Sequence, residues 1–378
     1  MKDRAVRNRI LGIVAMAVAA GALIVTAMLM RKQGGSTDGV TLRDFAMGSL
    51  VTVTLYGSEE ETEEVAKTVM EKIHRLDEDV ISRRVEGSEL SDWNRNAKAG
   101  EEVPISNALS RALSGTDLVR EFSGNVLDIT LRPVLDAWGI EDKDPATFQV
   151  PTEEELREAA DHTGMDKITR RNGLTRSCED VTLDLGSVGK GYALDVAYDY
   201  LMLGDHSAPA FKANELRSGR DSTVTGGVIA VGGSVMVFGS KADGSDFKVG
   251  VRDPEGQPED VIGTILIPSG YGRTCVSTSG GYEKYIEKDG VRYHHIIDPR
   301  TLQPAKSGLK SVTVVCKGEQ ATDWQGLVSD GLSTACFILG EEASKNVLKA
   351  LGAEAVMIRE DGSIYVTEGL RDAWKETR

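Results

Sequence analysis

The sequence predicts an α+β protein, built mainly of antiparallel sheets with packed helices and preceded by one N-terminal transmembrane helix. Short segments that alternate apolar and polar residues, such as VTVTLYG and SVTVVCK, predict strands with one covered face, which pair antiparallel. Helical patterns are interleaved with these strands, so we expect an α+β protein rather than a doubly wound sheet. Three residue pairs mark turns between strands: Asn172-Gly173, Asp289-Gly290 and Asp361-Gly362.

Local patterns predict the elements in chain order. MGSLVTVTLYG is a strand that ends at Gly57, and Ser58 caps the helix that follows. Residues 205–224 and 317–328 are polar insertions without a pattern. The expected helices are one with Val65, Val69, Ile73 and Leu76 on one face, one over about 107–122 that ends at Gly124, one from Pro151-Thr152 to Gly164, and others near 191–202, 328–339 and 342–351.

The N-terminal segment is separable from the rest. Residues 10–30 contain no charged side chain and are long enough to cross the roughly 30 Å core of a bilayer. A cleaved signal peptide has a shorter apolar region that is followed by a small-residue site. Here AVAAGA lies inside the run, so we expect an uncleaved anchor. Four Lys/Arg precede the run and two follow it, which predicts a cytoplasmic tail (residues 1–9) and an extracytoplasmic remainder.

The rest of the chain is strongly acidic. The whole chain carries a net charge of −15, although residues 1–35 hold six Lys/Arg and one Asp. Such a domain does not hold nucleic acid through its phosphates, and a bound phosphate compound would need a divalent metal or local dipoles beside it. The four cysteines form no CxxC pair, and Cys316 and Cys336 lie in apolar segments, so we expect buried free thiols rather than bridges.

Residues 184–195, DLGSVGKGYALD, form a glycine-rich turn between a strand pattern and a helix pattern. Neither common phosphate-binding fingerprint fits this stretch. A P-loop needs a glycine where Asp184 stands, and the spacing here is GxxGxG rather than GxGxxG. On the glycines alone, a phosphate site and a plain tight turn both remain open.

Three other segments carry polar residues in apolar surroundings. Asp128 is either a turn-capping residue or a ligand contact. Strand alternation puts His295 on the apolar face and His294 on the opposite one, so His295 is either a core histidine or a catalytic base. Asp330 and Thr334 lie one helical turn apart, which suits half of an oxygen-only Mg²⁺ site, although Asp330 could instead be an N-cap.

The order of these segments resembles the FAD:protein FMN transferase (ApbE) family. The series runs MGS, SELSDWN, GNVLDITLRPVLDAW, DLGSVGKGYALD, GG…HHIIDPRT, SDGLSTACFILG. The resemblance implies a T-fold-related catalytic domain over residues 42–370, between a tether (31–41) and a C-terminal tail (371–378). It also fits an anchored extracytoplasmic domain at a bacterial cell membrane.

The resemblance implies an activity and its site residues. Family members transfer FMN from FAD to a Thr or Ser of an acceptor protein, here one of a membrane redox system, and release AMP with Mg²⁺ as cofactor. The implied roles are FAD contacts for Met47, Val126, Leu127, Asp128, Asp184, Lys190 and Ile297, metal ligation for Ser187, Asp330 and Thr334, and general base for His295. The positions that depart from the family pattern are Ser49 for Thr, Ser234 for Asp, Leu302 for Gly, and Arg84 where an aromatic often lies.

Two other functions remain open on the sequence, as does a structural membrane-anchored domain with decayed sites, which the substitutions at Ser49, Ser234 and Leu302 would fit. Water in place of the acceptor hydroxyl would make the protein an FAD pyrophosphatase that yields FMN and AMP. A protein that only binds FAD outside the cytoplasm is the other alternative, but such a protein has no need of a base at His295 or of the pair Asp330 and Thr334.

Overall fold

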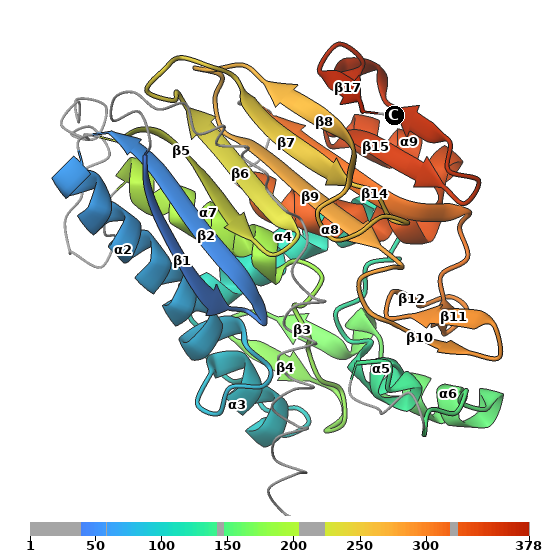
Figure 1. The fold of residues 1–378 in the computed structure, drawn as a ribbon. Coiled ribbons are helices and arrows are strands. Elements are labelled where there is room, and N and C mark those ends of the chain that lie inside the picture. The colour runs from blue at the N-terminus through green and yellow to red at the C-terminus, as the bar shows by residue number, and fades with distance from the viewer. Residues whose placement is uncertain (1–38, 58, 142–146, 204–223, 318–323, 378) are drawn as a thin grey trace, which may run out of the picture.

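The computed structural model describes residues 39–57, 59–141, 147–203, 224–317 and 324–377 (Figure 1). Its centre is an eight-stranded antiparallel sheet in the order β1-β2-β5-β6-β9-β14-β15-β16. The strands of this sheet are β1 (Val40–Ala46), β2 (Ser49–Gly57), β5 (Val224–Val231), β6 (Ser234–Gly239), β9 (Thr274–Gly280), β14 (Leu309–Lys317), β15 (Glu354–Arg359) and β16 (Ile364–Val366).

Helices cover one face of the central sheet and a smaller sheet covers the other. In chain order, the helices of the described residues are α2 (Glu59–Arg75), α3 (Glu89–Asn96), α4 (Asn107–Phe122), α5 (Arg132–Trp138), α6 (Glu153–Ala160), α7 (Gly189–Leu203), α8 (Gln325–Leu339) and α9 (Glu341–Ala350), with a π-helical turn at Leu76–Ile81. Of these, α5 and α6 lie apart from the layer on the sheet. The small antiparallel sheet consists of β17 (Trp374–Glu376), β8 (Val261–Ile267) and β7 (Phe247–Arg252).

Two hydrophobic clusters fill the two interfaces of the central sheet. On β5, Ile229 and Val231 pack with α2, α4, α7 and α8, whereas Val228 and Ala230 pack with β7 and β8. The expectation that only one face would be covered is therefore wrong for the middle strands. Their apolar residues follow one another without alternation because the side chains on both faces of these strands are buried.

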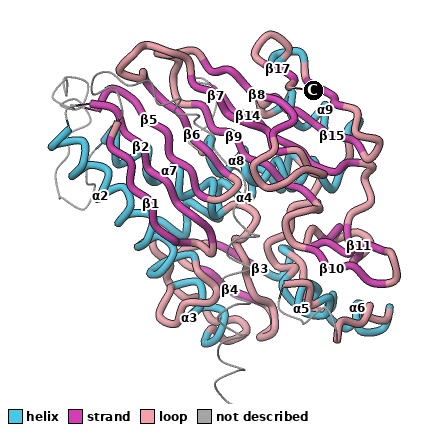
Figure 2. Tube along the Cα trace, in the orientation of Figure 1, coloured by secondary structure: helices cyan, strands magenta, loops and turns pink. Residues whose placement is uncertain are grey.

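A third unit stands beyond one end of the central sheet (Figure 2). It contains α5, α6 and the hairpins β10 (Tyr285–Lys288)–β11 (Val291–His294) and β12 (Ile297–Asp298)–β13 (Gln303–Pro304). Its own cluster is centred on Trp138, Phe148 and Ile297. A separate hairpin, β3 (Ile168–Arg170)–β4 (Leu174–Arg176), lies above and to the right of α3 in the same view.

Most sequence expectations are confirmed within the described residues. The three turn pairs join β3 to β4, β10 to β11 and β15 to β16, and all the expected helices form. Thr152 begins α6 with a capping box to Glu155. The four cysteines are free, and three of them are buried.

Other expectations need correction or lie outside the described residues. Met47 and Gly48 form a turn rather than the start of a strand, and α8 begins at Gln325, within the supposed insertion. The expected C-terminal tail supplies β17, whose Trp374 packs closely against Gly263. Residues 10–30, the predicted cap Ser58 and residues 205–223 of the predicted insertion lie outside the described residues. Among the described residues, none of the helices is long and apolar enough to cross a membrane.

Candidate active site

The candidate site lies where two hairpin turns meet the start of α7. Met47 and Gly48 connect β1 to β2 with φ of 54° and 66°, as a two-residue type I′ turn requires. The Met47 N–H donates to Asp77 Oδ2 at 2.6 Å. On the β5–β6 turn, a Cβ added to Gly232 would be 3.3 Å from Lys190 Cδ. The turns therefore bring Met47 and Lys190 to the same end of the sheet.

The stretch DLGSVGKGYALD is a tight loop that leads into α7. Asn94, from the SELSDWN segment, holds the residue before it, because its amide both donates to the carbonyl and accepts from the N–H of Leu183 at 2.8 Å. The next N–H, of Asp184, donates to Ile129 O at 2.8 Å. Asp184 Oδ1 accepts from Gly186 N at 2.9 Å. These bonds fix the loop on three sides.

Asp330 approaches this loop from α8. It lies in the second turn of the helix, and the N-cap is Trp324, so the N-cap interpretation of Asp330 is wrong. The residue is 3% exposed, and its carboxylate accepts from Gly191 N at 2.8 Å. Burial raises the pKa of Asp330, against the lowering effect of Lys190 and the Gly191 amide. Asp330 therefore stabilises the start of α7, a helix other than its own.

The residues around Asp330 suit a hard cation such as Mg²⁺. Thr334 follows one turn later on α8, and its Oγ1 lies 3.0 Å from Ser279 Oγ. Ser187 belongs to the loop directly before α7, and Asp330 contacts the N-terminal turn of this helix. The donors are a carboxylate and hydroxyl groups, which Mg²⁺ prefers to nitrogen or sulfur ligands. The described residues contain no group of three or more His, Cys, Asp or Glu arranged to hold a metal ion, so hydroxyl oxygens would be needed.

His295 lies just beyond β11, which ends at His294, rather than within a continuous strand. Its Nδ1 lies 3.2 Å from Lys284 O. A carbonyl can only accept, so Nδ1 carries the proton and Nε2 keeps its lone pair. Burial, with a smaller effect of the Lys284 ammonium, lowers the pKa of His295 to about 3. The imidazole is therefore neutral at pH 7, with its lone pair on Nε2.

His294 is the structural histidine of the pair. Its Nε2 donates to Ala305 O at 3.1 Å, and its Nδ1 accepts from Ile296 N at 3.3 Å. Its ring packs edge-on against Phe337 of α8. Both nitrogens are occupied, so the core role that the sequence left open for His295 belongs to His294.

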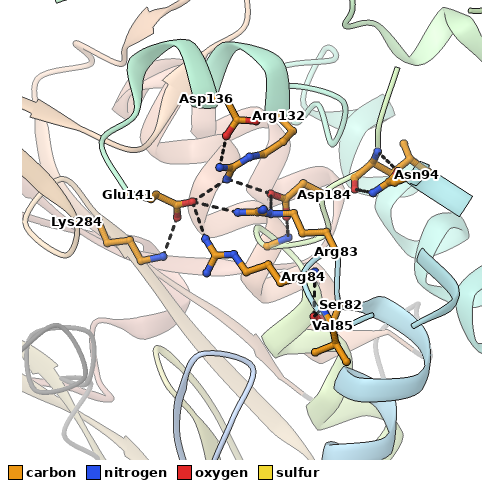
Figure 3. A network of polar contacts seen from close by, with 12 residues as sticks. Ser82, Arg83, Arg84, Val85, Asn94, Arg132, Asp136, Glu141, Asp184 and Lys284 are labelled. Carbon is orange, nitrogen blue, oxygen red and sulfur yellow. Dashed lines mark hydrogen bonds and ion pairs between the residues drawn. The ribbon is translucent and has the colours of Figure 1, made fainter. Parts of the chain in front are cut away.

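A cluster of cations around Glu141 was not anticipated from the sequence (Figure 3). Glu141 Oε2 accepts from Arg132 at 2.8 Å, from Arg84 at 3.3 Å and from Arg83 at 3.4 Å, and Oε1 accepts from Lys284 at 2.8 Å. Burial opposes ionisation of Glu141, but Lys284 and Arg132 outweigh it and hold its pKa far below the usual range.

The cation cluster also reaches the glycine-rich loop. Arg83 Nε lies 2.6 Å from Asp184 Oδ2, and Arg132 Nη1 lies 3.8 Å from the same oxygen. Arg132 interrupts the apolar segment ITLRPVL, and this charge in an apolar segment is the one sign in the sequence that could have pointed to the cation cluster. The other cations could not be grouped with it, because they come from distant segments.

The remaining predicted contacts occupy packed or turn positions. Asp128 Oδ1 accepts from Thr130 N at 2.8 Å, so the turn-capping interpretation is confirmed. Val126, Leu127 and Ile297 are buried in hydrophobic clusters, and their contacts with FAD stay predictions. Leu302, where the family pattern has glycine, has a φ of 61°, a conformation that favours glycine.

Comparisons with known proteins identify the family and the fold. The sequence model of the ApbE family matches residues 47–357. The chain is 29% identical to an FAD:protein FMN transferase from Vibrio cholerae serotype O1, over 78% of this chain and 80% of the relative. It is 26% identical to one from Haemophilus influenzae, over 88% of each. The crystal structure of the ApbE protein from Thermotoga maritima superposes with a TM-score of 0.72 at 29% identity, covering 89% of this chain and 100% of that one.

The Glu141 cluster predicts a pH-dependent contribution to stability. The pKa of Glu141 is lower in the folded than in the unfolded chain, so its stabilisation is present above about pH 4.5 and is lost as the pH falls further. Glu141→Gln should lower the free energy of unfolding at pH 7 by about 2 kcal/mol, because four cations lose their shared anion. The difference from wild type should shrink below pH 4.5.

Denaturant unfolding at several pH values measures this effect. Glu153→Gln is the matched control, since Glu153 pairs with Arg157 at 2.7 Å with its side chain 82% exposed. An exposed pair contributes about 0.5 kcal/mol or less. Equal losses in both variants, or a difference that does not change with pH, would contradict the assignment.

Proposed function

The chain belongs to the ApbE family, and we propose that it transfers FMN from FAD to a Thr or Ser hydroxyl of an acceptor protein. The transfer forms a phosphoester and releases AMP. The observation that carries this proposal is the state of His295, a neutral imidazole with its Nδ1 bonded to a carbonyl and its Nε2 able to accept a proton. A base of this kind serves transfer to a hydroxyl and has no purpose in a protein that only binds FAD.

In the proposed reaction, His295 Nε2 takes the proton of the acceptor hydroxyl as its oxygen attacks the FMN-side phosphorus. The bond to the AMP-side phosphate breaks, and AMP leaves with the bridging oxygen. Arg83, Arg132 and Lys284 supply positive charge on the side of the site that holds Glu141. Phosphoryl transfer depends mostly on such positioning and electrostatic stabilisation.

Asp330, Thr334 and Ser187 would hold Mg²⁺ in this proposal, and Lys190 would lie beside the pyrophosphate at the start of α7. The bound ion would withdraw charge from the pyrophosphate and make AMP a better leaving group. The N-terminus of α7 adds a favourable dipole for an anion. The oxygen-only donor set around the buried Asp330 supports this assignment.

The first experiment distinguishes the three candidate functions. The detergent-solubilised full chain is incubated with FAD, Mg²⁺ and a candidate acceptor domain, and the acceptor is weighed by mass spectrometry. We expect a mass gain equal to phosphoester-bound FMN together with free AMP, and neither product when EDTA removes Mg²⁺. Free FMN and AMP without acceptor labelling would identify a pyrophosphatase, and FAD binding without products would identify a carrier.

The second experiment separates the two histidines. His295→Asn should lower the transfer rate by about 10² to 10⁴, the usual contribution of a general base. FAD affinity and the thermal midpoint should change little. His294→Asn should instead lower the midpoint, because it removes two bonded nitrogens from a packed ring.

His162→Asn is the surface control for both variants, since His162 lies 3.5 Å from Asp180 with its side chain 39% exposed. It should leave the rate and the midpoint unchanged. If the loss of rate at His295 is accounted for by weaker FAD binding, or equals that of the control, the base assignment fails.

We also propose that residues 10–30 anchor the chain in the cell membrane, with the catalytic domain outside the cytoplasm. The uncharged run and the excess of Lys/Arg before it support this orientation. The acceptor would then be a membrane redox protein on the same side. Protease added to intact cells should cleave the domain while the chain remains in the membrane fraction. A secreted form that begins between residues 17 and 35 would show a cleaved signal instead.

A further inference from the structure

The starts of α7 and α8 carry the same short pattern. Each has a glycine in its first turn and an aspartate four residues later: Gly191 and Asp195 on α7, Gly326 and Asp330 on α8. Four residues correspond to about one helical turn, so each aspartate lies on the same face as its glycine.

The two patterns contact each other reciprocally. Asp195 Oδ1 accepts from Gly326 N and Asp195 Oδ2 accepts from Leu327 N, both at 2.8 Å. In return, Asp330 Oδ2 accepts from Gly191 N at 2.8 Å. Each helix therefore supplies the carboxylate that satisfies free N–H groups at the start of the other, where a helix has no internal acceptors.

The glycines allow this exchange because no side chain separates the helices. A Cβ on Gly191 would lie 2.0 Å from Gly326 O, and a Cβ on Gly326 would lie 2.2 Å from Gly191 O. A shift of one helix along the other by a single residue, about 1.5 Å, would disrupt the bonds in both directions. The two aspartates together thus set the position of α7 relative to α8 along the helix axes.

The two carboxylates differ in their counter-charge. Asp195 is fully buried and pairs with Arg273 Nη1 at 3.3 Å, and the Arg273 guanidinium stacks 4.4 Å from the centre of the Tyr198 ring. Among the described residues, Asp330 has no arginine in an ion pair with it, and Lys190 is the cation that lowers its pKa. Asp195 therefore has a permanent protein cation, whereas Asp330 remains open to a removable one.

We propose that Asp195 is a positioning residue for Asp330. By capping α8 and pairing with Arg273, it holds α8 in the position along its axis in which Asp330 contacts the start of α7 and can bind a divalent cation. The inference rests on the proposed function only for the role of the cation. In this proposal Asp195 acts through α8 rather than by contact with the cation or FAD.

The test measures ion binding to the full chain without FAD, with Mn²⁺ as the probe, by calorimetry or electron paramagnetic resonance. Asp195→Asn should weaken Mn²⁺ binding by about 10- to 100-fold, the usual effect of a residue that supports a metal ligand. FAD affinity should change by less than about threefold. The transfer rate should recover at saturating metal concentration, because the substitution raises the KM for the metal and leaves kcat unchanged.

Asp199→Asn is the matched control. Asp199 lies one turn further along α7 and pairs with Arg111 at 2.8 Å, but it does not cap α8. It should lower stability without changing Mn²⁺ affinity. If Asp195→Asn does not fold, the double variant with Arg273→Gln removes both buried charges and should show the same weakened binding. Unchanged Mn²⁺ affinity in the folded variant, or equal weakening in Asp199→Asn, would overturn the proposal.

Hydrogen exchange separates failure of this inference from failure of the proposed function. Asp195→Asn should accelerate exchange at the amides of Gly326 and Leu327, and also at Gly191, which Asp195 does not contact. A wild-type chain that neither binds Mn²⁺ nor transfers FMN would refute the proposed function. In that case the exchange rate of the Gly191 amide in Asp195→Asn would still show whether the two helix starts are coupled. No change at that amide would overturn the positioning role.

Discussion

The main-chain contact between Gly191 and Gly326 is the constraint on which the candidate site depends. Two helix starts touch there without an intervening side chain, and only this approach lets Asp330 accept from the Gly191 amide. The glycine-rich loop is held by Asn94 on one side and leads into α7 on the other. If the helices were separated by the width of one methyl group, the loop and Asp330 would no longer share a fixed geometry.

Charge is the second organising feature, because the chain is acidic overall and its proposed substrate is an anion. Four cations from three separate segments gather at Glu141, which keeps them from repelling one another. In a partly buried site with an effective dielectric constant near 20, a pair at 4 Å interacts by about 4 kcal/mol, several times its strength in water. The protein thus gathers cations in one place although its net charge is −15.

Local patterns were sufficient for much of the fold and less of the site. The Asn-Gly and Asp-Gly pairs predicted their hairpins because those residues accept the turn conformation, and helix periodicity located α4, α7, α8 and α9. Strand β1 escaped notice because VTLRDFA lies at the sheet edge with only Ala46 buried, and Asp44 interrupts its apolar alternation. The cations around Glu141 depend on tertiary contacts that no local pattern records. The paired Gly-x-x-x-Asp patterns were also missed, because a five-residue repeat acquires meaning only when its two copies touch.

The distance along the chain between contacting groups has a consequence for the folding order. Gly191 and Asp330 are 139 residues apart, and Lys284 and Glu141 are 143 residues apart. Contacts this distant close large loops and form late, which slows folding. During synthesis from the N-terminus, α7 lacks its cap until residues 325–339 have left the ribosome. An unfinished chain therefore carries the glycine-rich loop without the aspartate that completes it.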